Sequence, residues 1–367
     1  MSKSQNYIFK SLFFCLIFLL TFPHFSLAAS DKSHSQTSHS KEEKIKPGEI
    51  IIDHVINHHS WHICTIKDKP VSVPLPVILH SRDRGWFFFM SDKFNHGHDT
   101  YKNFKILHEG KNKGMIVELD GQGNIKEEKP LDLSITKVVA GGMFAAILMI
   151  IVFISIARSY KRSPNKPPKG LQSLLEPIIV FIRDDVARSN IGEEKYEKFT
   201  PFLLSIFFFI FLNNLLGLIP IFPAGANVTG NITVTMTLAL FTFLVTIISG
   251  NKHYWTEIVN PPAVPWWLKI PIPLVPIIEI MGIFTKPFVL MIRLFANISA
   301  GHIVALGFLT LIFIFGSINP IIGYGVSVVS VAFTIFLTLL ELLVAFIQAY
   351  VFTILSAIYF GMAVGEE

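Results

Sequence analysis

Two long stretches of this sequence lack the charged side chains that a water-exposed surface needs. Residues 201–250 contain no Asp, Glu, Lys or Arg, and residues 294–365 contain only one, Glu341. Over all 367 residues, 16% are charged and 51% are apolar, whereas about 25% are charged in a typical soluble domain. A bilayer crossing needs about 20 mainly apolar residues. The composition therefore excludes one large water-soluble enzyme and predicts an integral membrane protein with a polar N-terminal third.

Residues 1–28 have the features of a secretory signal peptide. Lys3 and Lys10 supply positive charge, residues 12–22 form a short apolar core, and residues 26–28 (Ser-Leu-Ala) fit a cleavage site. An uncleaved first span is the alternative, which the short apolar run disfavours. Export would place residues 29–132 outside the cytoplasm, in the periplasm of a cell with an inner membrane.

Residues 29–132 are expected to form a β-rich extracytoplasmic extension. Residues 30–46 are polar, and after them come short segments rich in Val, Ile and Phe, separated by Gly, Pro and Asp, which is typical of strands. The predicted strands are Val71–Ser81, Gly85–Phe94, Lys102–His108 and Gly114–Leu119. Cys64 is the only cysteine outside the signal peptide, so an internal disulfide is excluded.

From residue 133 onward the pattern predicts a mainly α-helical polytopic domain with five transmembrane helices. The predicted spans are residues 134–157, 201–219, 232–249, 272–316 and 321–363. The last two are about 40 residues long, roughly twice what a bilayer needs, so we expect a long, tilted or bent helical hairpin. Residues 171–188 have apolar side chains at helical spacing and predict an amphipathic helix on the cytoplasmic surface.

The distribution of basic residues predicts the orientation. Arg158, Lys161, Arg162, Lys166 and Lys169 follow the first predicted span, and the loops on the opposite side of the later spans carry no Lys or Arg. Basic loops stay in the cytoplasm, so the C-terminus is expected inside and residues 29–132 outside. This membrane flank also accounts for much of the net charge of +5, and we predict no nucleic-acid partner.

Five ionisable residues lie within the two longest apolar segments: Glu279, Lys286, Arg293, His302 and Glu341. An arginine at mid-bilayer costs about 3 kcal/mol or more, so a partner or a function is expected. Glu279, Lys286 and Arg293 are seven residues apart and share one helix face. Asn297, four residues further on, lies on the same face.

The other polar residues suit a proton pathway. His302 lies about 180° around the helix from Arg293, and Glu341 and Gln348 share a face of the last helix. A histidine paired with a carboxylate can exchange protons near neutral pH, whereas arginine stays positively charged and keeps a neighbouring carboxylate ionised. Structural roles remain open: Lys286 can extend to the membrane surface, Glu279 can pair with it, and Asn297 and Gln348 can join helices.

Other motifs are weak. His54, His58, His59 and His62 have spacings that could bind a metal, but solvated histidines are the favoured interpretation because no cysteine or acidic group completes the set. Motifs of phosphate-binding loops, zinc proteases and serine hydrolases are absent from the sequence. The sequence therefore predicts no catalytic activity for this chain by itself, no cofactor and no metal.

Residues 290–302 (LMIRLFANISAGH) resemble the signature of subunit a of the F-type ATP synthases, an arginine followed by Leu-Phe and then by Asn at the fourth position. Further resemblance lies at Pro261-Pro262, at residues 285–287 (TKP), at 213–220 (NNLLGLIP) and at 348–352 (QAYVF). The likeness covers roughly residues 134–367, in consistent order. It implies three regions: a signal peptide (1–28), an extracytoplasmic extension (29–132) and the subunit a membrane domain (133–367).

The resemblance implies a stator subunit in the cell inner membrane that couples proton transport to ATP synthesis. Its partners would be a ring of proteolipid c subunits, the peripheral-stalk b subunits and the rest of the complex. Arg293 would face the ring carboxylate between two offset aqueous half-channels. His302, Glu341, Asn297 and Gln348 match outer half-channel positions, and Glu279 and Lys286 match polar positions nearer the inner side.

Two departures from the family pattern stand out. Many bacterial relatives carry an acid at the position of His302 and a histidine at that of Glu341, as if the two were exchanged here. Residues 29–132 have no counterpart in the common family core, and we hypothesise that they cover the outer entrance. The alternative functions are a self-contained proton or cation channel or transporter, which would need no ring, and a membrane-tethered binding protein acting through residues 29–132.

Overall fold

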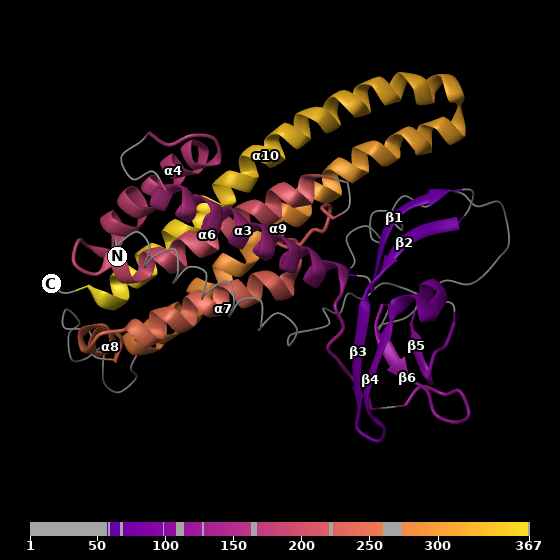
Figure 1. The fold of residues 1–367 in the computed structure, drawn as a ribbon, viewed down its shortest axis with the longest axis horizontal. Helices are drawn as coiled ribbons and strands as arrows, with labels where there is room; N and C mark the ends of the chain where they lie inside the picture. The colour runs from indigo at the N-terminus through magenta and orange to yellow at the C-terminus, as the bar shows by residue number, and fades with distance from the viewer. Residues whose placement is uncertain are drawn as a thin grey trace.

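The structure is a computed structural model, and it describes residues 57, 59–66, 69–97, 99–107, 114–126, 128–162, 167–219, 223–259 and 274–365. Within these ranges the protein is mainly helical, with a small β-rich region at one end of the helices (Figure 1). This arrangement confirms the predicted fold class. The signal peptide and His54 and His58 lie outside the described residues.

The β-rich region contains three small antiparallel sheets. Strands β1 (Ser60–Ile66) and β2 (Lys69–Pro74) form one, β5 (Phe104–Ile106) and β6 (Ile116–Glu118) another, and β4 (Gly85–Met90), β3 (Pro76–Ser81) and β7 (Leu131–Asp132) the third. A short helix, η2 (Ser91–Gly97), follows β4. Its Phe94 packs with Val77, Leu79 and Phe104 in the core of the region.

The predicted strand over 71–81 is wrong as a single element, because it is split between β2 and β3. Pro74 and Pro76 flank Leu75, and proline lacks the N–H that continues a strand ladder. The backbone N–H of Leu75 instead donates to the hydroxyl of Ser91 at 3.0 Å. The prediction also omitted β1 and β7, whose sequences lack a clear alternation of apolar residues.

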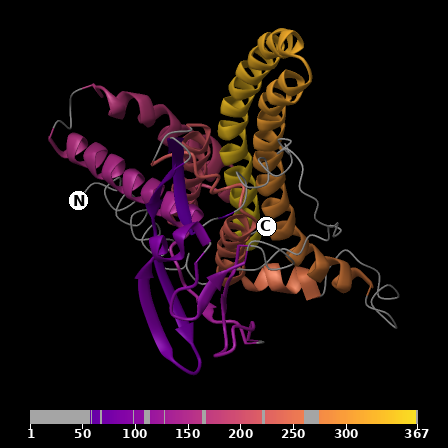
Figure 2. The same cartoon turned by 90° about the vertical axis from the view of Figure 1, so that its right-hand side faces the viewer.

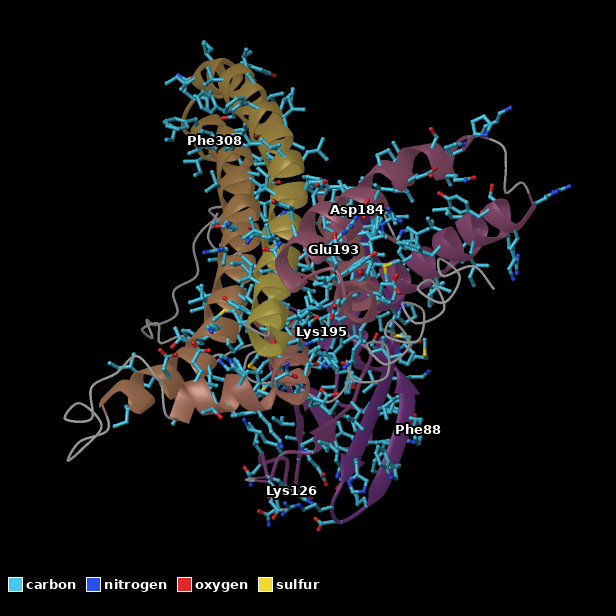
Figure 3. The ribbon with its side chains drawn as sticks, turned by 90° about the vertical axis from the view of Figure 1, so that its left-hand side faces the viewer. Phe88, Lys126, Asp184, Glu193, Lys195 and Phe308 are labelled. Carbon is cyan, nitrogen blue, oxygen red and sulfur yellow. The ribbon has the colours of Figure 1, made fainter. Side chains whose placement is uncertain are left out.

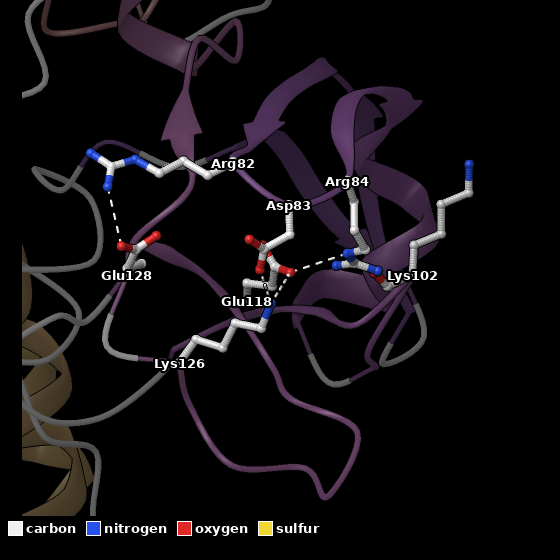
Figure 4. A network of polar contacts seen from close by, with 7 residues as sticks. All are labelled: Arg82, Asp83, Arg84, Lys102, Glu118, Lys126 and Glu128. Carbon is white, nitrogen blue, oxygen red and sulfur yellow. Dashed lines mark hydrogen bonds and ion pairs between the residues drawn. The ribbon is translucent and has the colours of Figure 1, made fainter.

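A network of charged side chains closes the end of the β-rich region that points away from the helices (Figure 4). Lys126 Nζ lies 2.9 Å from Glu118 Oε1 and 2.8 Å from Asp83 Oδ2, and Arg84 Nε lies 3.1 Å from Glu118 Oε1. Burial raises the pKa of Glu118, but hydrogen bonds from Ser81 and Lys126 and the charge of Arg84 outweigh it and hold the pKa below its ordinary value. The network therefore satisfies a carboxylate that is almost fully buried.

His59 ties the β-rich region to the start of the helical domain. Its side chain is only 8% exposed, and its Nε2 lies 3.1 Å from Asp132 Oδ2 at the end of β7. The interpretation of His59 as a solvated histidine is therefore wrong, because the fold buries it against a carboxylate that the sequence places 73 residues away. Among the described residues, no group of His, Cys, Asp and Glu is arranged to hold a metal ion.

This pair predicts an acid-sensitive attachment. Burial raises the pKa of Asp132, but His59 and Ser134 outweigh it, so the folded-state pKa is lowered. The ionised Asp132 stabilises the fold fully at a pH above its unfolded-state pKa of about 3.9. This stabilisation is lost as the pH falls through the lowered folded-state pKa. We expect pepsin cleavage near β7 of the wild-type protein to increase as the pH falls below about 3.9. The Asp132→Asn variant should already be cleaved readily at pH 5.

Glu128→Gln is the control, because the pair of Glu128 with Arg82 is exposed. Equal resistance of Asp132→Asn and Glu128→Gln to pepsin at pH 5 would contradict this prediction.

Within the described residues, the helical domain has five helices that are long and apolar enough to cross a membrane. They are α3 (Lys137–Arg162), α6 (Tyr196–Leu218), α7 (Ile232–Ser249), α9 (Leu274–Ile318) and α10 (Pro320–Val364). The prediction of five spans is confirmed. The predicted amphipathic segment is helical, as α4 (Leu171–Phe181) and a π-helical turn η3 (Ile182–Arg188), and it continues into α5 (Ser189–Ile191).

One segment predicted as a loop contains a helix. Residues 252–259 form α8 (Lys252–Val259), whose Tyr254 and Ile258 are buried against Ala363 near the end of α10. The sequence pattern missed this helix because its apolar residues are few and its stability comes from packing on α10 rather than from propensity.

Helix α6 is the centre of the helical core. Phe202, Leu203, Ile206, Phe207 and Ile210 are all at most 3% exposed. The helix is apolar on every side, which is typical of a helix surrounded by others. It packs against α3 and α10, with edge-to-face aromatic pairs on both sides. The core therefore fixes where α10, which carries two of the predicted site residues, lies relative to α6.

Helices α9 and α10 are each 45 residues long and form a hairpin that extends beyond the other helices (Figures 1 and 2). Asn319 joins them, and its side chain accepts from the backbone N–H of Ile321 and caps α10. The predicted long helical hairpin is confirmed. A straight 45-residue helix is about 68 Å long, so the pair exceeds the thickness of a bilayer and must tilt within it.

Trp61 connects the β-rich region to the membrane domain. It is 5% exposed and belongs to the same core as Val138 of α3 and as Ala226 and Val228 of the segment before α7. Gly141 makes this approach possible, since a Cβ there would lie 2.6 Å from Ala226 Cβ. The segment 223–231 thus lies between the β-rich region and the helices. Whether residues 29–132 cover an entrance stays a prediction.

At the opposite end of the helices, polar side chains cap the C-terminus of α10. Lys195 Nζ donates to the carbonyl of Val364 at 2.9 Å, and Asn251 Nδ2 donates to the same oxygen at 3.0 Å. A cation here is favourable because the helix C-terminus carries partial negative charge. The end of α10, α8 and the loop before α6 therefore gather at one end of the domain, away from the β-rich region (Figure 1).

Candidate functional site: an exposed arginine between two polar cavities

Arg293 is exposed on α9, and so are Val289 and Ala296, which lie about one turn before and after it on the same face. Ile292, next to it in the sequence, is 42% exposed. Within the described part of the chain, the Arg293 guanidinium makes no ion pair and no hydrogen bond. A guanidinium at a lipid-facing depth is costly without a partner, so this face is suited to a carboxylate from another subunit.

The backbone at Arg293 is held by a chain of amides between the two long helices. Gln348 Nε2 donates to the Arg293 carbonyl at 2.8 Å, and Asn297 Nδ2 donates to Gln348 Oε1 at 3.2 Å. Gln348 is 4% exposed. The sequence placed Asn297 on the face of Arg293 but did not connect it to Gln348. These bonds make both amides positioning groups that fix the register of α9 against α10 beside the arginine.

A small cavity brings three of the predicted residues together. Asn297, His302 and Glu341 line it, and Asn214 of α6 closes it. Its volume of about 20 Å³ is enough for about one water molecule. Glu341 Oε1 is buried and has no hydrogen-bond partner among the described residues. A buried carboxylate oxygen beside a water-sized polar cavity is suited to accepting and releasing a proton through water.

Gly301 lets the Glu341 side chain lie close to α9. A Cβ at position 301 would lie 2.5 Å from Glu341 Oε1 and 3.2 Å from its Cδ. The carboxylate can therefore lie against the backbone of α9, one residue before His302. Gly301 was part of the sequence motif, but its contact with Glu341 was not predicted.

Lys286 lines a second, smaller cavity on the other side of Arg293 along α9. The cavity has a volume of about 10 Å³, and Thr242, Thr246 and Tyr359 contribute to its lining. Lys286 Nζ lies 5.6 Å from the centre of the Tyr359 ring and 3.8 Å from Met362 Sδ. Among the described residues no close ion pair joins Lys286 to Glu279, although the charge of Glu279 acts on Lys286. Glu279 is exposed.

Several polar residues of the site were not singled out from the sequence. Asn214 Nδ2 donates to the carbonyl of Ala345 at 3.3 Å, and Thr229 donates to Asn214 Oδ1 at 2.5 Å. Ser299 donates to the carbonyl of Gly230 at 3.2 Å. The available signal was a pair of amides, Asn213-Asn214, in a span without charge. These bonds attach the segment 223–231 to the cavity that His302 and Glu341 line.

Five candidate membrane spans and an exposed arginine between two polar cavities define a polytopic subunit of an ion-translocating membrane assembly. The family model described as ATP synthase A chain matches residues 141–361. The chain belongs to the subunit a family of the F-type ATP synthases, the non-catalytic, proton-translocating stator subunits of the membrane sector.

The relatives agree with this assignment. ATP synthase subunit a of Chloroherpeton thalassium is 46% identical over 64% of this chain and 68% of its own length. ATP synthase subunit a 2 of Chlorobaculum tepidum is 48% identical over 64% of this chain and 65% of its own length. ATP synthase subunit a of Pelodictyon phaeoclathratiforme is 41% identical over 74% of this chain and 78% of its own length. A second family model, described as a domain of unknown function, matches residues 50–133.

Proposed function

We propose that Arg293 is the fixed positive charge that this subunit presents to a carboxylate on a ring of proteolipid c subunits. The observation that carries this proposal is the exposed guanidinium on α9, which forms no ion pair within the described part of the chain. Beside the arginine a ring carboxylate is held ionised, so it must release its proton before it passes. Arginine keeps its own proton, so it does not relay protons across the membrane.

The two cavities support two offset half-channels. Along α9, Lys286 precedes Arg293 by seven residues and His302 follows it by nine, which separates them by roughly 24 Å at 1.5 Å per residue. A proton would reach the ring through the cavity that His302, Glu341 and Asn297 line, with Gln348 bonded to Asn297 beside it. It would leave near Lys286, with Glu279 further toward the inner surface. Because the two paths do not meet, each proton travels with the ring, and one charge crossing 100 mV provides about 2.3 kcal/mol.

The proposed topology places the β-rich region outside the cytoplasm and the C-terminus inside. The β-rich region and the cap of α10 lie at opposite ends of the five spans (Figure 1). Arg158, Lys161 and Arg162 end α3 away from the β-rich region, as expected for a cytoplasmic flank in a cell inner membrane. The b subunits of the peripheral stalk would bind on the cytoplasmic side. We propose the boundaries 1–28, 29–132 and 133–367 for the signal peptide, the extension and the membrane domain.

Cysteine cross-linking tests the facing of Arg293 toward the ring. Ala296 is exposed on α9 and lies about one turn from Arg293. We expect Ala296→Cys to form a disulfide with a cysteine placed near the ring carboxylate in the assembled complex, and the cross-link to stop ATP hydrolysis. Leu294→Cys is the control, because Leu294 is only 1% exposed and should not react. Absence of any Ala296→Cys adduct along the ring helix would refute the facing.

A further inference from the structure

The sheet of β4, β3 and β7 has two apolar faces, of which only one is used by the core. The side chains of β4 alternate: Phe87 and Phe89 pack against the core around Phe94 and Phe104. Trp86, Phe88 and Met90 point to the other face and are 52%, 66% and 42% exposed. Three consecutive outward positions of one strand are thus large and apolar, where a solvated sheet would carry polar side chains.

The outward residues of the neighbouring strands extend this surface. Ile78 pairs with Phe88, and His80 pairs with both Trp86 and Leu131, so all of them lie on one face of the sheet. The ring centre of Trp86 lies 6.2 Å from that of Phe88, with the two rings stacked, and 4.7 Å from that of His80. Leu131 is 56% exposed. We call this surface, formed by Ile78, His80, Trp86, Phe88, Met90 and Leu131, the aromatic sheet face; none of its members is an acid, a lysine or an arginine.

The connection to α3 places the aromatic sheet face close to the membrane surface. β7 ends at Asp132, and α3, a membrane span, begins at Lys137. The five steps from Asp132 to Lys137 can extend over about 18 Å at most. Asn57 restricts this connection further. Its side-chain amide donates to the Thr136 hydroxyl and accepts from the backbone N–H of Val138, which ties Asn57 to the start of α3. The headgroup layer on each side of a bilayer is about 5–8 Å thick, so the sheet lies at or just above it.

The sheet also has the orientation needed to contact lipid. In Figure 1, β3 and β4 lie on the side of the β-rich region nearest the helices, and β5 and β6 lie on the far side. The core lies between these two layers, so the aromatic sheet face is turned back toward the end of the helical domain. Figure 3 views the molecule from the helical side, and Phe88 is seen there on the part of the β-rich region that extends past the helices.

We propose that the aromatic sheet face rests on the lipid bilayer, at the boundary between headgroups and acyl chains. Tryptophan and other aromatic side chains are enriched at this boundary, because their rings suit a layer that is apolar on one side and wet on the other. An uncharged patch of this kind on a water-facing surface indicates an interaction site. The helix that follows β7 also exposes apolar side chains, since Ile147 and Ile151 of α3 are 49% and 59% exposed, and this favours lipid as the occupant.

Spin-label accessibility tests the proposal in the assembled complex, reconstituted in vesicles of phosphatidylcholine and phosphatidylglycerol. In a background with Cys15 and Cys64 replaced by serine, a nitroxide is attached to Phe88→Cys or Trp86→Cys. Gln122→Cys, in an exposed turn of the same region, is the matched control. We expect the labels at 86 and 88 to collide with oxygen several-fold more than with a water-soluble nickel chelate, and the label at 122 to show the opposite preference.

Two other outcomes would overturn the proposal. A label at 88 that reaches the nickel chelate as freely as the label at 122 would show that the face is in water. A label shielded from both reagents would show that protein covers the face. A second measurement avoids cysteine substitutions: brominated lipids should quench more tryptophan fluorescence in the wild-type complex than in Trp86→Phe, and equal quenching would contradict lipid contact.

Discussion

Replacing Arg293 by alanine is expected to reduce proton-driven ATP synthesis by about 100-fold or more. A nearby opposite charge lowers the pKa of a carboxyl group by roughly 1–3, so losing it changes the ionised fraction by about 10- to 1,000-fold. Without the positive charge, a ring carboxylate keeps its proton while it passes the subunit, and rotation no longer requires a proton to cross. The measurement is ATP synthesis by inverted vesicles under an imposed pH difference and membrane potential.

The neighbouring residue provides a control for this variant. Ile292 is 42% exposed next to Arg293 on α9, so Ile292→Ala removes exposed side-chain surface without removing charge and should retain at least half of the wild-type rate. Passive proton conductance should not fall in Arg293→Ala, because the arginine is a barrier to direct passage and not a carrier. Coupled synthesis in Arg293→Ala at half the wild-type rate would disprove the role proposed for Arg293.

Glu341→Gln is expected to slow proton uptake from the outer side by at least about tenfold, because glutamine keeps the shape of the side chain but cannot transfer a proton. Gly301→Ala should have a similar effect by another route, since its methyl group would occupy the space 2.5 Å from Glu341 Oε1 and displace the carboxylate. The displaced group is the end of a side chain, so we expect the complex to assemble. The measurement is the rate of synthesis at increasing outside pH.

Ser330→Ala is the control on the same helix. Ser330 is 2% exposed and lies outside the cavity that His302 and Glu341 line. It should leave the dependence on outside pH unchanged, whereas Glu341→Gln should limit the rate most when protons outside are scarce. A normal pH dependence in both Glu341→Gln and Gly301→Ala would place Glu341 outside the proton pathway and leave it a structural residue.

The position of Glu341 shows why the pathway could be predicted only in part. Glu341 is the only charged residue in 294–365. Because burying an isolated carboxylate in a membrane costs free energy, this pattern predicted a functional role for it. Helical spacing then placed it with Gln348 on one face. Which residues of other helices meet that face depends on how α6, α9 and α10 pack. Asn214 and Gly301 are therefore visible only in the structure.

The β-rich region could also be predicted only in part from the sequence. Apolar segments marked β3, β4, β5, β6 and most of β2. They did not mark β1 or β7, which are held by pairing and by the contacts of His59 and Trp61. Alternation within β4 could not distinguish the face that packs on Phe94 from the face that stays exposed, because both carry large apolar side chains. Only the placement of β5, β6 and η2 decides which face is covered.

The sequence by itself determined the five membrane spans, the long hairpin and the ionisable residues within it, because the low solubility of charge in lipid acts on each segment separately. The tertiary structure decided which of these residues share a cavity, that the Arg293 guanidinium forms no ion pair within the described part of the chain, and which face of a sheet is left exposed. These features depend on contacts between segments that are far apart in the chain, and hydrophobic periodicity carries no information about such contacts.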